Sequence, residues 1–514
     1  MNWRLLVLAL LLPASALAQP VSWDAGLTLV PTGEFVHAGS SYRSSSSLGA
    51  RWTSPGGVVV RRYILDVTEA RSRRAIDLAP EATDTLVTDL KAGTTYTARL
   101  RACMDDGCAT FIEATERPSA ATADEYWRVN GSGHSFATAD RVVDDGNVGS
   151  HAFKYGPWAG PELDGRLQLY YNPIQRDEKG AKIAELASAS PRTLDEASRF
   201  RGVSGYGLLR VCAPQNSGNV DPACATSRSL AAGLALFQAV PLSPEAGGRV
   251  RLYFEAEGYD GRTRILHLDS RDGYIGRDFH AGPATRCSTL ADYSAGGGCD
   301  PSLDIGVDVD GANGFPGIRN ARQFKVAYPT RDSWAWDLAP GAFMWFTTEW
   351  PNGSCSTFGF NAAFAVWNGT RWVVQAIQPD EGCPKMLKGV QAPAPVHLGG
   401  ARYKLYFNRH NTPGGVTNPL TTIKPMQMLY ADGEWTGDAR RVDFEDWEGV
   451  DAAREVHYLW PDGTPLTEDE ESRLDDYVIL APTTDPTALI MYSNMSSTGV
   501  GAFPFIGSAV LVNP

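Results

Sequence analysis

Three glutamates stand at matching positions of a strand pattern that recurs along the chain. Glu255 closes one copy of the pattern, Glu257 follows two residues later, and Glu349 holds the position of Glu257 in the next copy. Residues two apart share one face of a strand, so these carboxyl groups form a candidate set. Hydrolysis of a glycosidic bond needs two carboxyl groups, one protonated as acid and one ionised as base or nucleophile. Ordinary solvated rim residues are the alternative interpretation.

The pattern itself is a short aromatic strand that occurs five times after residue 120, at 169–172, 252–255, 344–347, 405–408 and 491–494. Aromatic residues alternating with polar ones suit a half-buried strand. A recurring strand indicates a repeat architecture, because one unit cannot bury its apolar face alone. We therefore predict an all-β fold with a five-bladed β-propeller. Six or seven blades are the alternative, because the copies lie further apart than the roughly 40–50 residues of ordinary propeller repeats.

Oxygen-rich side chains also gather in the glycine-rich segment 304–314. Asp304, Asp308 and Asp310 could hold Ca²⁺ there, although the segment lacks the spacing and the final Glu of an EF-hand. A plain turn is the alternative. Zinc motifs, phosphate-binding loops and serine-nucleophile signatures are absent from the sequence. Tryptophans are frequent between residues 334 and 460, where they could stack on sugar rings but suit the core of the blades better.

Eight cysteines fall into four neighbouring pairs, which are Cys103 with Cys108, Cys212 with Cys224, Cys287 with Cys299, and Cys355 with Cys383. An even number in an exported chain favours disulfides. Sequential pairing is the simplest connectivity, although spacing alone does not prove it. Each bond would then close a local loop or hairpin.

The first eighteen residues resemble a secretory signal peptide. Arg4 gives a basic start, residues 5–12 form an apolar run too short to span a bilayer, and residues 16–18 form a small-x-small cleavage site. No later stretch reaches the ~20 apolar residues of a membrane span. We expect a secreted or periplasmic protein. Its formal net charge of -13 argues against nucleic acid as a partner.

Residues 21–118 predict an antiparallel sandwich. Strands are expected at 48–52 and 58–67, with Tyr63, Leu65 and Val67 on one face. The stretch resembles a fibronectin type III domain, whose motifs Trp-x-x-Pro and Leu-x-x-Gly-Thr-x-Tyr correspond to Trp52, Pro55, Leu90, Gly93, Thr94 and Tyr96. The resemblance implies that the Tyr96 hydroxyl bonds back to the preceding loop. It also implies that Cys103 and Cys108 staple the last hairpin.

The recurring strands resemble those of five-bladed β-propeller glycoside hydrolases, and the resemblance spans residues 125–514. Those enzymes place an acidic residue on each of three early blades, and Asp140, Asp144 and Asp145 are candidates for the first of them. The resemblance therefore implies Asp145 as a partner of the three glutamates. A fibronectin type III module beside a catalytic domain is also familiar in secreted carbohydrate-active enzymes.

Together these observations predict a signal peptide at 1–18, a fibronectin type III-like domain at 21–118, a linker at 119–124 and a propeller at 125–514. The expected function is that of a secreted carbohydrate-active protein, a glycoside hydrolase acting on an oligo- or polysaccharide. The alternative, from another class, is a non-catalytic extracellular protein that binds a glycan or another protein through the propeller. Carboxyl groups converging within ~5–10 Å would favour the enzyme.

Overall fold

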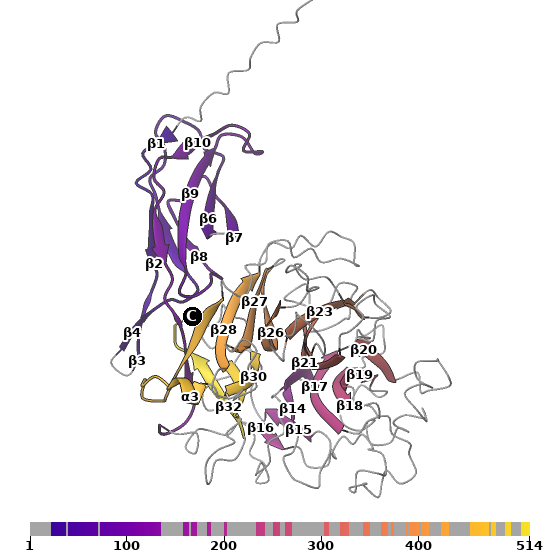
Figure 1. The fold of residues 1–514 in the computed structure, drawn as a ribbon. Coiled ribbons are helices and arrows are strands. Elements are labelled where there is room, and N and C mark those ends of the chain that lie inside the picture. The colour runs from indigo at the N-terminus through magenta and orange to yellow at the C-terminus, as the bar shows by residue number, and fades with distance from the viewer. Residues whose placement is uncertain are drawn as a thin grey trace, which may run out of the picture.

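The computed structural model describes residues 22–37, 40–69, 72–134, 453–471 and 505–513, together with the strands between residues 158 and 494. The predicted signal peptide, 1–18, lies outside the described residues. Figure 1 shows an N-terminal sandwich standing beside a larger group of sheets. The described part of the chain is rich in strands and contains one short helix, α3 (Glu468–Glu471), so the all-β prediction is confirmed.

The sandwich consists of two facing sheets and a hairpin. One sheet has the order β1-β10-β9-β6-β7, with β11 also paired to β9, and the other has the order β2-β5-β8. Strands β3 and β4 form the hairpin. The strands are β1 (Ser22–Trp23), β2 (Thr28–Pro31), β3 (Glu34–His37), β4 (Ser40–Arg43), β5 (Leu48–Arg51), β6 (Arg62–Glu69), β7 (Ser72–Leu78), β8 (Asp84–Val87), β9 (Thr95–Cys103), β10 (Phe111–Ala114) and β11 (Ser119–Ala121).

Alternation along β6 and β9 builds the core between these sheets. Tyr63, Leu65 and Val67 are buried on one face of β6, as predicted, and Leu100 of β9 lies opposite Leu65. The Trp52 ring packs edge-on against Tyr63, with ring centroids 5.6 Å apart. Strand β6 begins at Arg62, later than the predicted start at 58.

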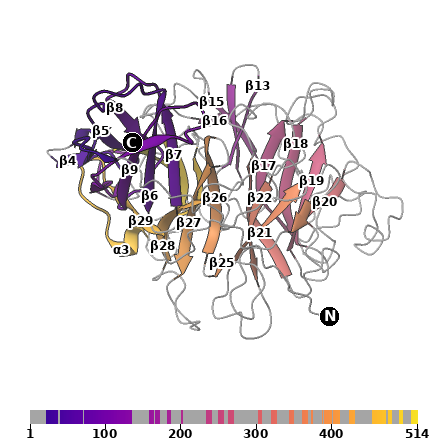
Figure 2. The same ribbon diagram turned by 90° about the horizontal axis from the view of Figure 1, so that it is seen from above.

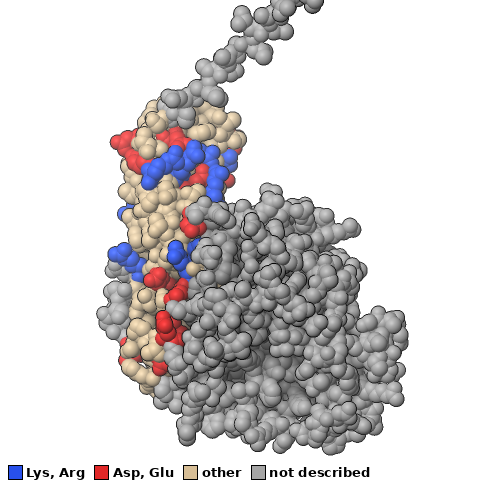
Figure 3. Space-filling view, in the orientation of Figure 1, with Lys and Arg blue, Asp and Glu red and all other residues tan. Residues whose placement is uncertain are grey.

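The outward face of the larger sheet is crossed by arginine–carboxylate pairs. The nearly buried Asp66 carboxylate accepts hydrogen bonds from Arg73 at 2.8 Å and from Arg101 at 3.0 Å. Figure 3 shows the resulting mixture of basic and acidic side chains across the visible face of the sandwich. Because each carboxylate joins neighbouring strands, these pairs stabilise the sheet by cross-strand attraction.

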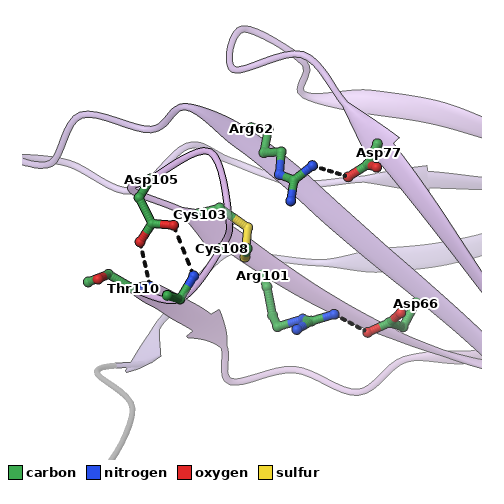
Figure 4. The surroundings of a disulfide bond; sticks show 9 residues. Arg62, Asp66, Asp77, Arg101, Cys103, Asp105, Cys108 and Thr110 are labelled. Carbon is green, nitrogen blue, oxygen red and sulfur yellow. Dashed lines mark hydrogen bonds and ion pairs between the residues drawn. A yellow bond between two sulfur atoms is a disulfide. The ribbon is translucent and has the colours of Figure 1, made fainter.

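The last hairpin of the sandwich is closed by the predicted Cys103–Cys108 disulfide, whose Cα atoms lie 4.7 Å apart (Figure 4). Inside this loop the Asp105 carboxylate accepts hydrogen bonds from the backbone N–H groups of Ala109 and Thr110. These bonds stabilise the charged form and lower the pKa of Asp105.

The other three predicted disulfides fall on parts of the chain that the structure does not describe. All six of their cysteines lie outside the described residues, and these are Cys212, Cys224, Cys287, Cys299, Cys355 and Cys383. The pairing of Cys212 with Cys224, of Cys287 with Cys299 and of Cys355 with Cys383 therefore stays a prediction.

The described strands after the sandwich form five antiparallel units, each with four successive strands as its frame. The first is β13 (Trp158–Leu163), β14 (Arg166–Tyr171), β15 (Lys182–Leu186) and β16 (Phe200–Gly202). The second is β17 (Gly233–Pro241), β18 (Val250–Glu257), β19 (Thr263–Asp269) and β20 (Leu303–Val307). The third is β21 (Arg319–Ala327), β22 (Phe343–Glu349), β23 (Asn361–Trp367) and β24 (Trp372–Val374), with β25 (Leu387–Lys388) also paired to β23.

The fourth and fifth units are joined into one eight-stranded sheet. The fourth is β26 (Val390–Gly399), β27 (Arg402–His410), β28 (Ile423–Tyr430) and β29 (Arg454–Leu459). The fifth is β30 (Leu474–Ile479), β31 (Leu489–Asn494) and β32 (Phe505–Leu511), completed by β12 (Glu125–Val129). Strand β12 pairs antiparallel with β32 and parallel with β29. Strand β12, which comes before the first unit in the sequence, therefore completes the fifth unit.

The units follow one another as the blades of a β-propeller do. The first strand of each unit contacts the first strand of the next, from β13 through β17, β21 and β26 to β30. Figure 2 shows the second unit running in order from β17 near the middle of the molecule to β20 at its edge. The predicted β-propeller with five blades agrees with this arrangement of the described strands.

The segment 180–199 carries alanine, isoleucine, leucine and glutamate at spacings that allow a short helix, yet Lys182–Leu186 form the third strand of the first unit. Pairing with β14 overrides the helical preference of alanine, leucine and glutamate in this segment. A capping box opens α3, because the Thr467 hydroxyl accepts from the Glu470 N–H and the Glu470 carboxylate accepts from the Thr467 N–H.

Candidate functional site

The aromatic strand found in the sequence is the second strand of every blade. Its five copies lie in β14, β18, β22, β27 and β31. The aromatic position of each copy is held by Tyr170, Tyr253, Trp345, Tyr406 and Tyr492. One sequence pattern therefore marks one structural position five times.

The second strands end where the first strands begin. Glu257 pairs with Gly233 at the start of β17, and Glu349 pairs with Arg319 at the start of β21. In the fifth blade, Asn494 likewise pairs with Leu474 at the start of β30. Because the first strands of successive blades contact one another, these ends lie beside the innermost strands of the sheets.

The predicted catalytic residues fall on this position in two neighbouring blades. Glu255 and Glu257 lie two residues apart in β18, and Glu349 is the last residue of β22. The structure places their backbone in these strands. Asp145, together with Asp140 and Asp144, lies outside the described residues.

The predicted calcium ligands are divided between a strand and a segment that is not described. Asp304 lies in β20, where its register partner is His267 of β19. Asp308 and Asp310 lie outside the described residues. Within the part of the chain that the structure describes, no three metal-ligating side chains gather.

The fourth blade shows how one face of a second strand is used. Asn408 holds the position in β27 that Glu255 holds in β18, and it is fully buried. Its side-chain amide donates to the Leu474 carbonyl at the start of β30, at 3.5 Å. Lys404 and Tyr406 share this face of β27 and also contact the fifth blade. This face therefore packs against the next blade.

A buried carboxylate joins these two blades. Glu125, at the start of β12, accepts hydrogen bonds from the Trp127 indole N–H at 2.5 Å and from the Tyr406 hydroxyl at 2.8 Å. Its second oxygen lies 3.4 Å from the Lys404 ammonium, and both charged side chains are about as inaccessible as the apolar core. Burial, followed by the charge of Glu125, raises the pKa of Tyr406 well above its ordinary value.

This cluster could not be predicted from motifs, because nothing near Glu125 in the sequence marks it as buried. Only the alternation of Glu125, Trp127 and Val129 could have suggested an inward-facing side chain. The cluster can hold two blades together, but a ligand cannot reach it.

A histidine–carboxylate pair lies beyond the ends of the parallel strands β12 and β29. The His134 Nε2 atom lies 2.5 Å from a carboxylate oxygen of Asp462, and both side chains are about half exposed. The Thr464 N–H donates to Asp462 and lowers its pKa, and His134 lowers it further. Asp462 lies in the segment 454–463, which is rich in charged and aromatic side chains. A histidine and a carboxylate alone do not define a reaction.

Residues 36–115 match the family model of the fibronectin type III domain. This match and the sandwich described above identify the N-terminal domain as a fibronectin type III domain. The predicted corner is present, because the Tyr96 hydroxyl accepts from the Lys91 N–H at 2.9 Å. A solved fibronectin type III domain of human collagen alpha-1(XX) is 22% identical, with 24% of this chain and 98% of that chain covered and a TM-score of 0.17.

Solved structures similar to the remaining part are glycoside hydrolases. A thermostable family-43 glycoside hydrolase is 9% identical, with 70% of this chain and 88% of that chain covered and a TM-score of 0.37. An α-L-arabinofuranosidase from Podospora anserina is 12% identical, with 76% and 97% covered and a TM-score of 0.36. No curated protein sequence matches this chain. In the described residues, no helix has the length and apolar character needed to cross a membrane.

Proposed function

We propose that this protein is a secreted carbohydrate-active enzyme that hydrolyses glycosidic bonds in an oligo- or polysaccharide. The observation that carries the proposal is the aromatic strand in the second position of all five blades, with glutamates at its end in the second and third blades. The sequence pattern resembles that of five-bladed propeller glycoside hydrolases. The predicted signal peptide and the Cys103–Cys108 disulfide support export, since disulfides persist in oxidising compartments.

The three glutamates do not rank equally in this proposal. Glu255 corresponds in register to Asn408, whose side chain is buried against the next blade. Glu257 and Glu349 occupy the last residue of their strands, beside the starts of the first strands. We therefore assign the acid and base roles to Glu257 and Glu349, and to Glu255 a supporting position between blades.

Glycoside hydrolysis requires this pair to supply one acid and one base or nucleophile. One carboxyl group protonates the leaving oxygen, and the other, ionised, either activates water or attacks the sugar carbon. A separation of ~5–5.5 Å gives retention of configuration, and ~6.5–9.5 Å gives inversion. Asp145 is a third carboxyl group that could orient the sugar or tune the pKa of the acid.

Release of reducing sugar from a panel of plant and bacterial polysaccharides tests the proposal. Glu349→Gln and Glu257→Gln should each lower the rate by about 10²–10⁴-fold, since the amide neither donates an acidic proton nor accepts one. Glu81→Gln, at an exposed site on the fibronectin type III domain, is the matched control and should leave the rate of sugar release unchanged. Thermal unfolding of each variant separates a catalytic loss from misfolding.

Two results would overturn the assignment. Full activity in both glutamine variants would remove Glu257 and Glu349 from the mechanism. Retention of the protein on a polysaccharide gel without any sugar release would instead favour the alternative function, a non-catalytic glycan-binding protein.

A further inference from the structure

A buried asparagine, Asn513, forms hydrogen bonds with both the fibronectin type III domain and the first strand of the propeller. The Asn513 side-chain amide donates to the Arg43 carbonyl at 2.9 Å and to the Asp124 carbonyl at 2.7 Å. Its side-chain oxygen accepts from the Tyr126 N–H at 3.0 Å. Its backbone carbonyl accepts from the N–H and the hydroxyl of Ser45, at 2.9 and 2.7 Å. One side chain therefore binds the end of β4 and the beginning of β12 at once.

The segment that connects the two domains is bonded to the fibronectin type III domain along its length. Residues 119–121 are strand β11, paired with β9. The Thr122 hydroxyl donates to the Lys91 carbonyl at 2.7 Å. The Ala123 N–H donates to the Ser44 carbonyl, and the Ala123 carbonyl accepts from the Gly93 N–H. A flexible linker would instead leave its backbone groups to water.

Close packing adds to these hydrogen bonds. A Cβ atom at Gly93 would lie 2.5 Å from a carboxylate oxygen of Asp124, so the turn and the connecting segment already touch. Three partly buried rings also meet across the junction. The Tyr126 ring of β12 lies with its centroid 4.8 Å from Tyr42 of β4 and 5.4 Å from His457 of β29.

We propose that the fibronectin type III domain is a rigid extension of the fourth and fifth blades, locked by Asn513, and not a mobile spacer. Domains that share a small, wet interface move relative to each other by default. Here the contacts converge on a fully buried residue whose side-chain amide donates two hydrogen bonds and accepts one. Whatever surface the domain presents is therefore held at a set place beside the propeller, and this holds whether or not the propeller hydrolyses a glycan.

Hydrogen exchange measured by mass spectrometry on the whole protein tests the proposal. In the wild type, the amides of Ser45, Ala123 and Tyr126 should be protected to a degree similar to those of β9. Asn513→Ala removes the three side-chain hydrogen bonds of Asn513, of which one is to the Tyr126 amide, and so weakens the junction as a whole. Exchange at the three amides should therefore become about tenfold faster or more, while exchange in β9 stays unchanged. Solution scattering should fit one rigid arrangement for the wild type and a spread of arrangements for the variant.

A milder pair of variants covers the case in which Asn513→Ala fails to fold. Ser45→Ala removes one hydroxyl from the junction, and Ser119→Ala removes an exposed hydroxyl bonded to Thr97, in the connecting segment but away from Asn513. Ser45→Ala should speed exchange at Tyr126 by a few fold, and Ser119→Ala should not. Unprotected junction amides in the wild type, or equal effects of the two serine variants, would overturn the proposal.

Discussion

Two tyrosines are buried in the core of the fibronectin type III domain, and their hydroxyl groups differ in hydrogen bonding. The Tyr96 hydroxyl accepts a hydrogen bond from the Lys91 N–H. The Tyr63 hydroxyl is equally buried but has no hydrogen-bond partner among the described residues. A buried polar group without a partner costs free energy, whereas a paired one contributes to stability.

Removing each hydroxyl should therefore have opposite consequences. Tyr96→Phe leaves the Lys91 N–H buried without an acceptor, and it should lower the free energy of unfolding by about 1–3 kcal/mol. Tyr63→Phe should leave that free energy unchanged or raise it slightly. Denaturant titrations of the two variants measure both values. Equal losses would contradict the hydroxyl assignment and would point to ring packing instead.

At this scale, motifs that are local in sequence were predictable and long-range pairs were not. The corner formed by Tyr96 is confirmed, because its bond to the Lys91 N–H spans only a few residues. Glu125 meets Lys404 across 279 positions, and Asn513 meets Tyr126 across 387. No pattern in one sequence reveals such partners, since both side chains look like ordinary surface residues until the blades are assembled.

Among the elements, the joint between the fourth and fifth blades depends on a buried ion pair. Glu125 and Lys404 are both withdrawn from water, so each charge needs the other to offset its desolvation. The Arg62–Asp77 pair across β6 and β7 offers a contrast, because it is open to solvent, which screens the attraction between its charges.

A double-mutant cycle should expose this dependence. Glu125→Gln or Lys404→Met alone should lower the free energy of unfolding by about 3–5 kcal/mol, because each leaves a buried charge unpaired. The double variant should lose clearly less than the sum of the two. The same cycle on Arg62 and Asp77 should give about 0–1 kcal/mol. Additive losses at Glu125 and Lys404 would show that the two side chains act independently.

Elements with a strong side-chain pattern could be found in the sequence, and weakly patterned ones could not. The second strands were recognised from their aromatic positions. The third strand β15, with the sequence Lys-Ile-Ala-Glu-Leu, suited a short helix equally well until pairing with β14 decided the matter. The candidate glutamates were therefore placed on the correct kind of strand, but their register against the first strands came only from the structure.

For the whole molecule, β12 joins the chain that follows the sandwich to the last part of the propeller. It lies between β29 and β32 in the eight-stranded sheet. Trp127, at its centre, is fully buried and packs edge-on against Tyr406 of the fourth blade. Its side chain therefore stabilises the fourth and fifth blades together.

Truncating this side chain should destabilise the propeller as a unit. Trp127→Ala should cost about 3–5 kcal/mol, the usual loss for a large aromatic removed from a core. Val59→Ala, in the loop before β6 where the residue is 75% exposed, should change stability by less than about 0.5 kcal/mol. Thermal unfolding followed by tryptophan fluorescence and by circular dichroism gives both values. A loss confined to one blade would appear as transitions that do not coincide.

The position of β12 also sets an order of events during synthesis. A ribosome makes this strand first among the strands of its sheet, yet both of its hydrogen-bonded neighbours, β29 and β32, come from the last part of the chain. The fibronectin type III domain can fold as soon as it emerges, since domains generally fold as units from the N-terminal side. The backbone groups on both edges of β12 then stay without their strand partners until the chain has been made as far as Leu511. A chaperone or the adjoining folded domain has that whole interval in which to keep the waiting edge from pairing with another chain.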